Sequence, residues 1–337
     1  MAESVLVTGG AGYVGSVLVE RLVRDGFEVR ILDSMIFGSG GLAAVRDECE
    51  IMHGDVTDVD CLVQALRGVD CVLHLAAISN DSSGDLDPEW TTQVNFEATK
   101  QLTDLAKEND AVRFIYASSS SVYGIKTEPN VSEDLSLNPL TIYSKTKAWS
   151  ERYVLAQESS DFAPVCVRSA TVCGYSPRQR LDTVVNVFVC DALTKGEITV
   201  NGGEQQRPLI HIADLCDYYV HLLRAPVELI SGAVFNAGGG NYALMEIAKL
   251  VADHLQKNVK ITRRPRTAKS RSYHISSELV RAKLGLVPQR TVTDAIADLN
   301  AAFEDGLIPD PDDSVYRNIE RLKEIAAPKE DAGQWRK

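Results

Sequence analysis

The stretch SVLVTGGAGYVG, residues 4–15, decides the fold class of this chain. Residues 4–8 have the apolar pattern of a buried strand, and Gly9, Gly12 and Gly15 follow at G-x-x-G-x-x-G spacing. Residues 13–24 then carry apolar side chains at helical spacing. Glycines let the backbone turn tightly and approach a diphosphate, which the free N–H groups at a helix N-terminus bind. We therefore predict a strand–turn–helix unit that holds a dinucleotide through Gly9, Gly12, Tyr13, Val14 and Gly15.

The alternation of strands and helices continues through the first half of the chain. Short apolar runs predict strands at 27–32, 50–53, 71–75, 113–117 and 164–167, with helical periods at 59–66, 91–108 and 143–158. This pattern is typical of an α/β protein with a Rossmann-type, doubly wound parallel sheet. We expect that domain to span residues 1–170, completed by part of 205–235. A smaller α/β substrate domain is expected over 171–308, and a peripheral helix and tail over 309–337.

The composition excludes several classes of protein. The 337 residues are 45% apolar and 24% charged, and a net charge of −12 without a basic run argues against nucleic acid as a partner. The seven cysteines form no C-x-x-C pair and the six histidines show no ligand spacing, so we expect neither disulfides nor a metal site. No apolar run approaches the ~20 residues of a membrane span, and no basic leader is present. A cytoplasmic protein without membrane contact is expected.

Asp33 ends the second predicted strand, where a carboxylate accepts hydrogen bonds from the adenosine ribose hydroxyls. No arginine or lysine follows until Arg46, so a 2′-phosphate would lack a cation and NAD is favoured over NADP. Ligands in a doubly wound sheet lie at the carboxyl ends of the strands. The residues expected there, after the third and fourth strands, are Asp55, Val56, Leu75, Ala76 and Ala77.

Tyr143 and Lys147 lie four residues apart in a predicted helix and therefore on one helix face, and the serine run 118–121 follows a predicted strand. An ammonium group beside a phenol can lower its pKa from about 10 toward neutral pH. The phenolate so formed can accept a hydroxyl proton while hydride leaves the same carbon, and a serine hydroxyl can hold the substrate oxygen. This pattern predicts a hydride-transfer site.

Together, these motifs resemble the extended short-chain dehydrogenase/reductases that act on nucleotide sugars. The matching segments are residues 9–15, 55–56, 74–77, 118–124 and 143–147, and further counterparts are Asn95, 207–214, 235–238 and 271–273. The resemblance covers roughly residues 4–300.

The resemblance implies roles for individual residues. Tyr143 is expected to be the acid/base, Lys147 to orient the nicotinamide ribose, and Ser119 to be the catalytic hydroxyl. The resemblance also implies a nucleotide-diphosphate sugar as substrate and a homodimer formed through helices 91–108 and 143–158. The further binding residues that it implies are Asn95 for the cofactor and, for the substrate, Ser120, Asn186, Arg207 and Arg271.

The chain departs from the family at positions that bear on the reaction. Dehydratases and decarboxylases of the family usually carry a carboxylate directly after the catalytic hydroxyl, where this chain has Ser120 and Ser121. Serine cannot act as a carboxylate base at neutral pH. Thr171 stands where many sugar epimerases have asparagine, which leaves the sugar open. We therefore expect a redox-neutral, NAD-dependent epimerisation of a nucleotide-diphosphate sugar at C4, through a 4-keto intermediate.

Two alternatives stay open. One is an NAD(P)H-dependent nucleotide-sugar 4-ketoreductase, which would consume a nicotinamide at each turnover. The other is a non-catalytic dinucleotide sensor on the same fold, which the retention of Ser119, Tyr143 and Lys147 disfavours. Cys173, in the loop after the sixth strand, is expected to be a buried structural cysteine rather than a reactive one.

Overall fold

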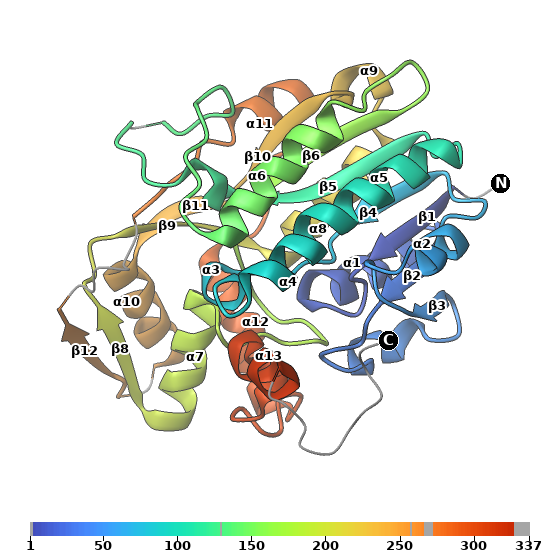
Figure 1. Ribbon diagram of the computed structural model, residues 1–337. Coiled ribbons are helices and arrows are strands. Elements are labelled where there is room, and N and C mark those ends of the chain that lie inside the picture. The colour runs from blue at the N-terminus through green and yellow to red at the C-terminus, as the bar shows by residue number, and fades with distance from the viewer. Residues whose placement is uncertain (1–2, 129, 257, 266–271, 327–337) are drawn as a thin grey trace.

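The computed structural model describes residues 3–128, 130–256, 258–265 and 272–326. Its centre is a seven-stranded parallel sheet with helices on both faces (Figure 1). This confirms the predicted Rossmann-type α/β fold. The strands run in the order β10-β6-β5-β4-β1-β2-β3, and their bounds are Ser4–Thr8 (β1), Glu28–Asp33 (β2), Glu50–His53 (β3), Cys71–His74 (β4), Arg113–Ser119 (β5), Ala163–Ser169 (β6) and Ala233–Ala237 (β10).

The central sheet buries alternate side chains of one strand on opposite faces. On one face Val5 packs with Leu18 of α1, and on the other Leu6 packs with Leu102 of α5. Because helices cover both faces, the strand is apolar at successive positions, which explains the run after Ser4. The helices of these layers are α1 (Tyr13–Arg24), α2 (Val59–Ala65), α5 (Ala98–Glu108), α6 (Ile142–Leu155) and α8 (Ile212–Arg224).

Within residues 171–308, most elements outside the central sheet and its covering helices form a second, smaller α/β part. A three-stranded sheet joins β7, β9 and β11, and a parallel pair joins β8 and β12. Val189, Leu209 and Ile247 lie in its apolar core. Its elements are β7 (Thr171–Cys173), α7 (Val184–Lys195), β8 (Glu197–Asn201), β9 (Gln206–His211), β11 (Gly240–Ala243), α10 (Leu244–Leu255), β12 (Lys260–Arg264) and α12 (Val292–Glu304).

The predicted helix 91–108 contains a wide turn. The chain passes from α4 (Pro88–Thr92) through a π-helical segment, η2 (Gln93–Glu97), into α5. The carbonyl of Asn95 explains the break, because it accepts hydrogen bonds from the hydroxyls of Thr99 at 2.8 Å and Ser150 at 2.7 Å. Side chains thus take an oxygen that would otherwise accept a regular helical N–H. The turn brings Asn95 against α6.

The C-terminal helix α13 (Asn318–Ala326) is less peripheral than the sequence suggests. Asn318 and Leu322 are buried, and Arg321 Nε donates to the carbonyl of Ile36, beyond β2, at 2.9 Å. The helix therefore packs on the cofactor side of the central sheet. The remaining short elements are η1 (Gly40–Val45), α3 (Asp81–Gly84), η3 (Ser120–Tyr123), α9 (Val227–Ile230), α11 (Glu278–Leu284) and η4 (Ser314–Tyr316).

All seven cysteines are free. Cys173 is buried, and burial raises the pKa of its thiol to about 12, in agreement with a structural role. Within the described ranges, no group of three or more His, Cys, Asp or Glu side chains is placed to hold a metal ion. Over the same ranges, no helix has the length and apolar character needed to cross a membrane.

Candidate active site

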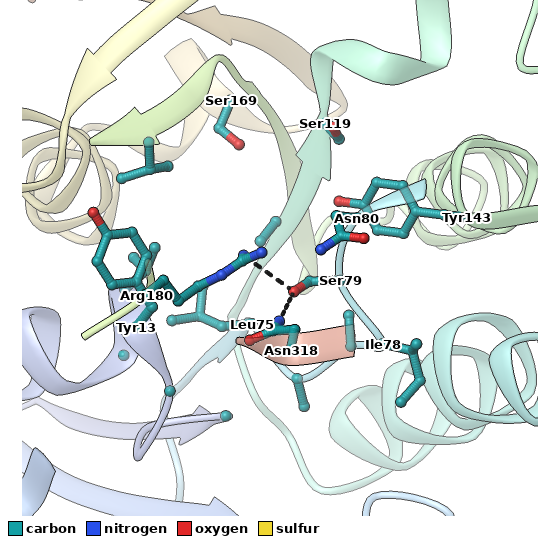
Figure 2. A pocket seen from close by; sticks show the side chains of 18 of the residues that line it. Tyr13, Leu75, Ile78, Ser79, Asn80, Ser119, Tyr143, Ser169, Arg180 and Asn318 are labelled. Carbon is teal, nitrogen blue, oxygen red and sulfur yellow. Dashed lines mark hydrogen bonds between the residues drawn. The ribbon is translucent and has the colours of Figure 1, made fainter. Parts of the chain in front are cut away.

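A cavity of about 340 Å³ opens where the loops after β1, β2, β4 and β5 meet α6 and the loop after β7 (Figure 2). β1 and β4 are neighbours in the sheet, so their following loops diverge and leave a crevice at the carboxyl ends of the strands. Most of the predicted site residues line this cavity: Gly9, Gly12, Tyr13, Val14, Gly15, Asp33, Asp55, Val56, Leu75, Ala76, Ala77, Ser119, Ser120, Tyr143 and Lys147.

The glycine-rich turn has no room for side chains at two of its positions. Gly9 has a φ of +74°, and a Cβ there would lie 2.7 Å from the backbone nitrogen of Ala76. A Cβ on Gly15 would lie 2.1 Å from the carbonyl oxygen of Gly9. Gly12 is the N-cap of α1, so no capping side chain covers the first N–H groups of the helix. The turn is therefore shaped for a close approach of the backbone to a phosphate.

Asp33 braces the glycine-rich turn. Its carboxylate accepts hydrogen bonds from the backbone N–H of Ala11 at 2.9 Å and of Met35 at 2.8 Å, while burial raises its pKa. The expectation that no cation stands near Asp33 is wrong, because Arg178 comes from a distant loop and its charge acts on the carboxylate. No basic residue lies between Asp33 and Arg46 in the sequence, but in the folded protein the charge of Arg178 acts on Asp33.

Two elements, β5 and α6, bring together the residues predicted for hydride transfer. Ser119 ends β5, and its Oγ accepts from the N–H of Ser121 at 3.2 Å. Tyr143 lies in the first turn of α6, whose N-cap Thr141 and third residue Ser144 form a capping box. Lys147 follows one turn later, and its Nζ donates to the carbonyl of Ala117 at 2.8 Å. The cap and this bond fix the helix face that looks into the cavity.

The predicted lowering of the tyrosine pKa by Lys147 does not occur in the protein alone. Burial raises the pKa of Tyr143 to about 12, and the charge of Asp81 also acts to raise it, whereas the Ser119 hydroxyl and the charge of Arg180 act to lower it. Burial also lowers the pKa of Lys147 to about 7. Both groups lose the water that would stabilise their charged forms, and the ammonium is held by Ala117 and lies 4.8 Å from the ring centre of Tyr116.

Asn95 and Asn186 lie outside the cavity and hold its walls. The Asn95 amide accepts from the N–H of Ile78 at 2.8 Å and donates to the carbonyl of the same residue at 3.0 Å. Asn186 is fully buried and donates to the Tyr13 hydroxyl at 3.0 Å, with Gly174 N–H donating to its oxygen. Both amides therefore form hydrogen bonds with residues around the cavity, and neither lines it.

The predicted substrate arginines are placed as follows. Arg207, in β9, lies with its guanidinium carbon 5.1 Å from the ring centre of Tyr273, and Tyr273 lines the cavity. Arg207 is thus one side chain removed from the cavity wall. Arg271 lies outside the described residues.

Several cavity residues carry no recognisable sequence signal. Asp81 follows β4 in the short helix α3, and Arg178 and Arg180 come from the loop between β7 and α7. Asn318 and Leu322 come from α13, more than 300 residues after the glycine-rich turn. None has a spacing that links it to the site, so only the tertiary structure identifies them.

The chain is similar in sequence to proteins of a known family. The model of the NAD dependent epimerase/dehydratase family matches residues 5–238. UDP-glucuronic acid decarboxylase 4 of Arabidopsis thaliana is 33% identical over 273 residues, which cover 78% of this chain and 60% of that protein, less than two thirds of its length.

Two crystal structures resemble the whole fold. The dTDP-glucose 4,6-dehydratase of Streptomyces venezuelae, solved with NAD bound, is 25% identical with a TM-score of 0.82, covering 90% of this chain and 98% of that one. UDP-glucuronic acid 4-epimerase of Bacillus cereus, solved with UDP-glucuronic acid and NAD, is 25% identical with a TM-score of 0.81, covering 90% and 99%. The family match and the hydride-transfer residues in the cavity agree with one another, and this chain belongs to the NAD dependent epimerase/dehydratase family of extended short-chain dehydrogenase/reductases.

Proposed function

We propose that this protein epimerises a nucleotide-diphosphate sugar at C4, with NAD retained and regenerated in each turnover. The observation that carries the proposal is the wall formed by the end of β5 and the start of α6. There Ser119 and Tyr143 both line the cavity and the Ser119 hydroxyl acts on the Tyr143 phenol, while Ser120 and Ser121 occupy the two positions after the reacting hydroxyl. This wall can move a hydroxyl proton, and neither Ser120 nor Ser121 can remove a carbon-bound proton as a carboxylate would.

The cavity residues fit a dinucleotide. The glycine-rich turn is a cradle that Cβ atoms would fill, and the uncapped start of α1 presents N–H groups to a diphosphate. Asp33, at the end of β2, and Lys147 both line the cavity. Asp33 would bind the adenosine ribose, and Lys147 would bind the nicotinamide ribose. When bound, NAD supplies a hydride acceptor and a positive charge near Tyr143.

The side chains of this chain would then divide the proton work. Ser119 donates a hydrogen bond that holds the C4 oxygen, and the Tyr143 oxygen accepts the C4 hydroxyl proton as hydride leaves C4. After the 4-keto sugar turns over in the cavity, hydride returns to the opposite face of C4 and Tyr143 gives the proton back. Because burial raises the pKa of Tyr143 to about 12 in the protein alone, forming its phenolate would need the positive charge that bound NAD would supply nearby.

One observation favours a second candidate, a dehydratase that removes water from the sugar. Asp81 lines the cavity, and its charge acts on Tyr143. Its carboxylate accepts a hydrogen bond from the Thr141 hydroxyl at the start of α6. The Asp81 carboxylate could therefore remove a proton from a carbon of the sugar, a role that Ser120 and Ser121 cannot perform.

NMR of nucleotide sugars in deuterated buffer separates the two reactions. UDP- and dTDP-sugars are incubated with the purified protein without added cofactor, and the anomeric protons are followed together with absorbance at the reduced-nicotinamide band. We expect one sugar to give its C4 epimer, with no deuterium on carbon and no net change in absorbance. Tyr143→Phe is the matched inactive control.

The other outcomes identify the alternatives. Deuterium at C5 with loss of water would contradict the epimerase and support the dehydratase, and Asp81→Asn would then abolish the exchange. Dependence on added NAD(P)H, with its stoichiometric consumption and conversion of a 4-keto sugar, would identify the ketoreductase. Loss of carbon dioxide from UDP-glucuronic acid would identify a decarboxylase.

A further inference from the structure

Two arginines, Arg178 and Arg180, line the cavity beside the start of α1. Their loop, residues 174–183, is fastened to the start of α1 by three hydrogen bonds. The Tyr13 hydroxyl donates to the carbonyl of Gly174 at 2.8 Å, the Ser176 hydroxyl donates to the carbonyl of Tyr13 at 2.7 Å, and the N–H of Arg178 donates to Ser16 Oγ at 3.4 Å. The two arginines are therefore held at a fixed place relative to the turn.

Arg178 is a buried cation with incomplete pairing. The residue is 5% exposed, and its guanidinium carbon lies 3.9 Å from the ring centre of Phe37. Nη2 donates to Asn318 Oδ1 at 2.8 Å, whereas Nε is buried without a hydrogen-bond partner. Within the described part of the chain, no carboxylate comes within 4.0 Å of its guanidinium. Burial and the nearby Arg180 together lower its pKa to about 9, which shows how poorly its charge is compensated.

Arg180 extends into the middle of the cavity between Tyr13 and Tyr143 (Figure 2). Its Nε is paired with Asp182 at 2.8 Å, and Nη1 donates to Ser79 Oγ at 3.3 Å. Ser79 also accepts from Asn318 Nδ2 at 3.0 Å, as the second dashed line in Figure 2 shows. Asn318 thus connects both arginines, one directly and one through Ser79.

The charges of this cluster match a diphosphate. Asp182 pairs with Arg180, while the charge of Asp33 acts on Arg178 without a contact within 4.0 Å. The loop therefore brings two guanidinium groups, one of them without an ion-pair partner, to a turn that carries no basic side chain of its own. A dinucleotide diphosphate has two negative charges, and guanidinium groups bind phosphate oxygens in a bidentate manner. An anion between the turn and the arginines would therefore supply the missing acceptors.

We propose that Arg178 and Arg180 bind the diphosphate of the cofactor together with the glycine-rich turn, and that Asn318 of α13 fixes them there. Two distant segments thereby close the dinucleotide site and keep NAD bound between turnovers. The proposal rests on cofactor binding in the proposed function and not on the reaction at C4. The position of Arg178 beside Asp33 and Phe37, at the end of β2, favours the cofactor over the diphosphate of the sugar nucleotide.

The test compares ligand binding by four variants. Arg178→Met removes the less compensated charge and keeps apolar contact with Phe37. Arg180→Met with Asp182→Asn removes a buried pair without leaving an unpaired carboxylate. Arg178→Lys restores a charge, and Arg24→Met is the control, because Arg24 is an exposed arginine of α1 paired with Glu20. Circular dichroism spectra check that each variant is folded.

Two quantities are measured: the NAD retained per chain after gel filtration, and the dissociation constants of nucleotide-free protein for NAD, NADP, ADP-ribose, adenosine, UDP and dTDP. We expect Arg178→Met and the double variant to bind NAD and ADP-ribose about 10- to 100-fold more weakly, the effect of one charge-assisted hydrogen bond to phosphate. Adenosine, which has no phosphate, should bind as before. Arg178→Lys should recover part of the affinity, and Arg24→Met should not differ from wild type.

Distinct results would overturn the proposal. Unchanged NAD affinity, or an equal loss for adenosine, would mean that the arginines only support the fold. Weaker binding of UDP or dTDP with unchanged ADP-ribose would assign them to the substrate diphosphate instead. Selective loss of NADP binding would assign Arg178 to a 2′-phosphate. These binding measurements do not depend on turnover, so they test the role of the two arginines even if the protein does not act as an epimerase.

Discussion

A buried ion pair docks α6, the helix of Tyr143 and Lys147, onto the central sheet. Glu151 follows Lys147 by four residues on the same helix, and its side chain is 4% exposed. Arg168 of β6, with 5% side-chain exposure, donates to it through both Nε, at 3.1 Å, and Nη2, and the Ser118 hydroxyl of β5 donates at 2.8 Å. We predict that Glu151→Leu destabilises the protein by about 3–5 kcal/mol, the usual cost of removing one partner of a buried pair.

The magnitude follows from the groups left behind. Without Glu151, two N–H groups of Arg168 and the hydroxyl of Ser118 lose their acceptor, at about 1–3 kcal/mol for each unsatisfied buried group before relaxation. Arg168 keeps its bonds to the Tyr123 hydroxyl at 2.7 Å and the Glu133 carbonyl at 3.2 Å, which limits the loss. Of a total stability of about 5–15 kcal/mol, such a loss is large.

Urea unfolding at saturating NAD measures this prediction, with Arg168→Met/Glu151→Leu as the matched variant. The double variant removes the orphaned charge together with the carboxylate, so it should recover most of the lost free energy of unfolding. A loss under about 1 kcal/mol for Glu151→Leu, or a double variant as unstable as the single one, would refute the assigned role of the pair.

Three further predictions concern the site and the surface. Tyr143→Phe should lower turnover by about 10²- to 10⁴-fold while NAD affinity, measured by calorimetry, stays as in wild type; a smaller loss would remove Tyr143 as the proton carrier. Lys147→Met should raise the free energy of unfolding of the cofactor-free protein at pH 7, because the lowered pKa of Lys147 means that carrying its charge in the folded state is unfavourable. Denaturation at increasing pH should show the stability difference between Lys147→Met and wild type shrinking toward pH 10. A difference that does not change with pH would contradict this prediction. A homodimer formed through α5 and α6 would cover Trp149, which is 43% exposed and packs edge-on against Phe96. Light scattering should therefore show a dimer for wild type and a monomer for Trp149→Asp. A monomeric wild type would contradict the predicted dimer.

The fold could be predicted because its signals are local. The apolar run before Gly9, the crowding at Gly15 and the spacing of Tyr143 and Lys147 each reflect contacts within one strand–turn–helix unit or one helix. Such contacts leave a pattern in a short window of sequence. The cavity walls built from these units therefore lie where the sequence places them.

What could not be predicted depends on contacts between distant segments. The charge of Arg178 acts on Asp33, which lies 145 residues away in the sequence, and Asn318 donates a hydrogen bond to Ser79, which lies 239 residues away. The tyrosine pKa was misjudged for a related reason, since the i, i+4 spacing gives the proximity of Lys147 but not the burial that dominates both groups. Asn95 and Asn186 match family positions, but the sequence does not reveal their hydrogen bonds to residues that line the cavity.

The central claim is that hydride leaves and returns to C4 within one cavity. A nucleotide sugar that the protein converts, labelled with deuterium at C4, tests it in a single turnover with excess enzyme in ordinary water. The account predicts that the epimer carries the deuterium at C4, without solvent hydrogen on any carbon, and that Tyr143→Phe forms this labelled product far more slowly. Loss of the label from C4 to solvent, or its appearance at another carbon, would contradict the account.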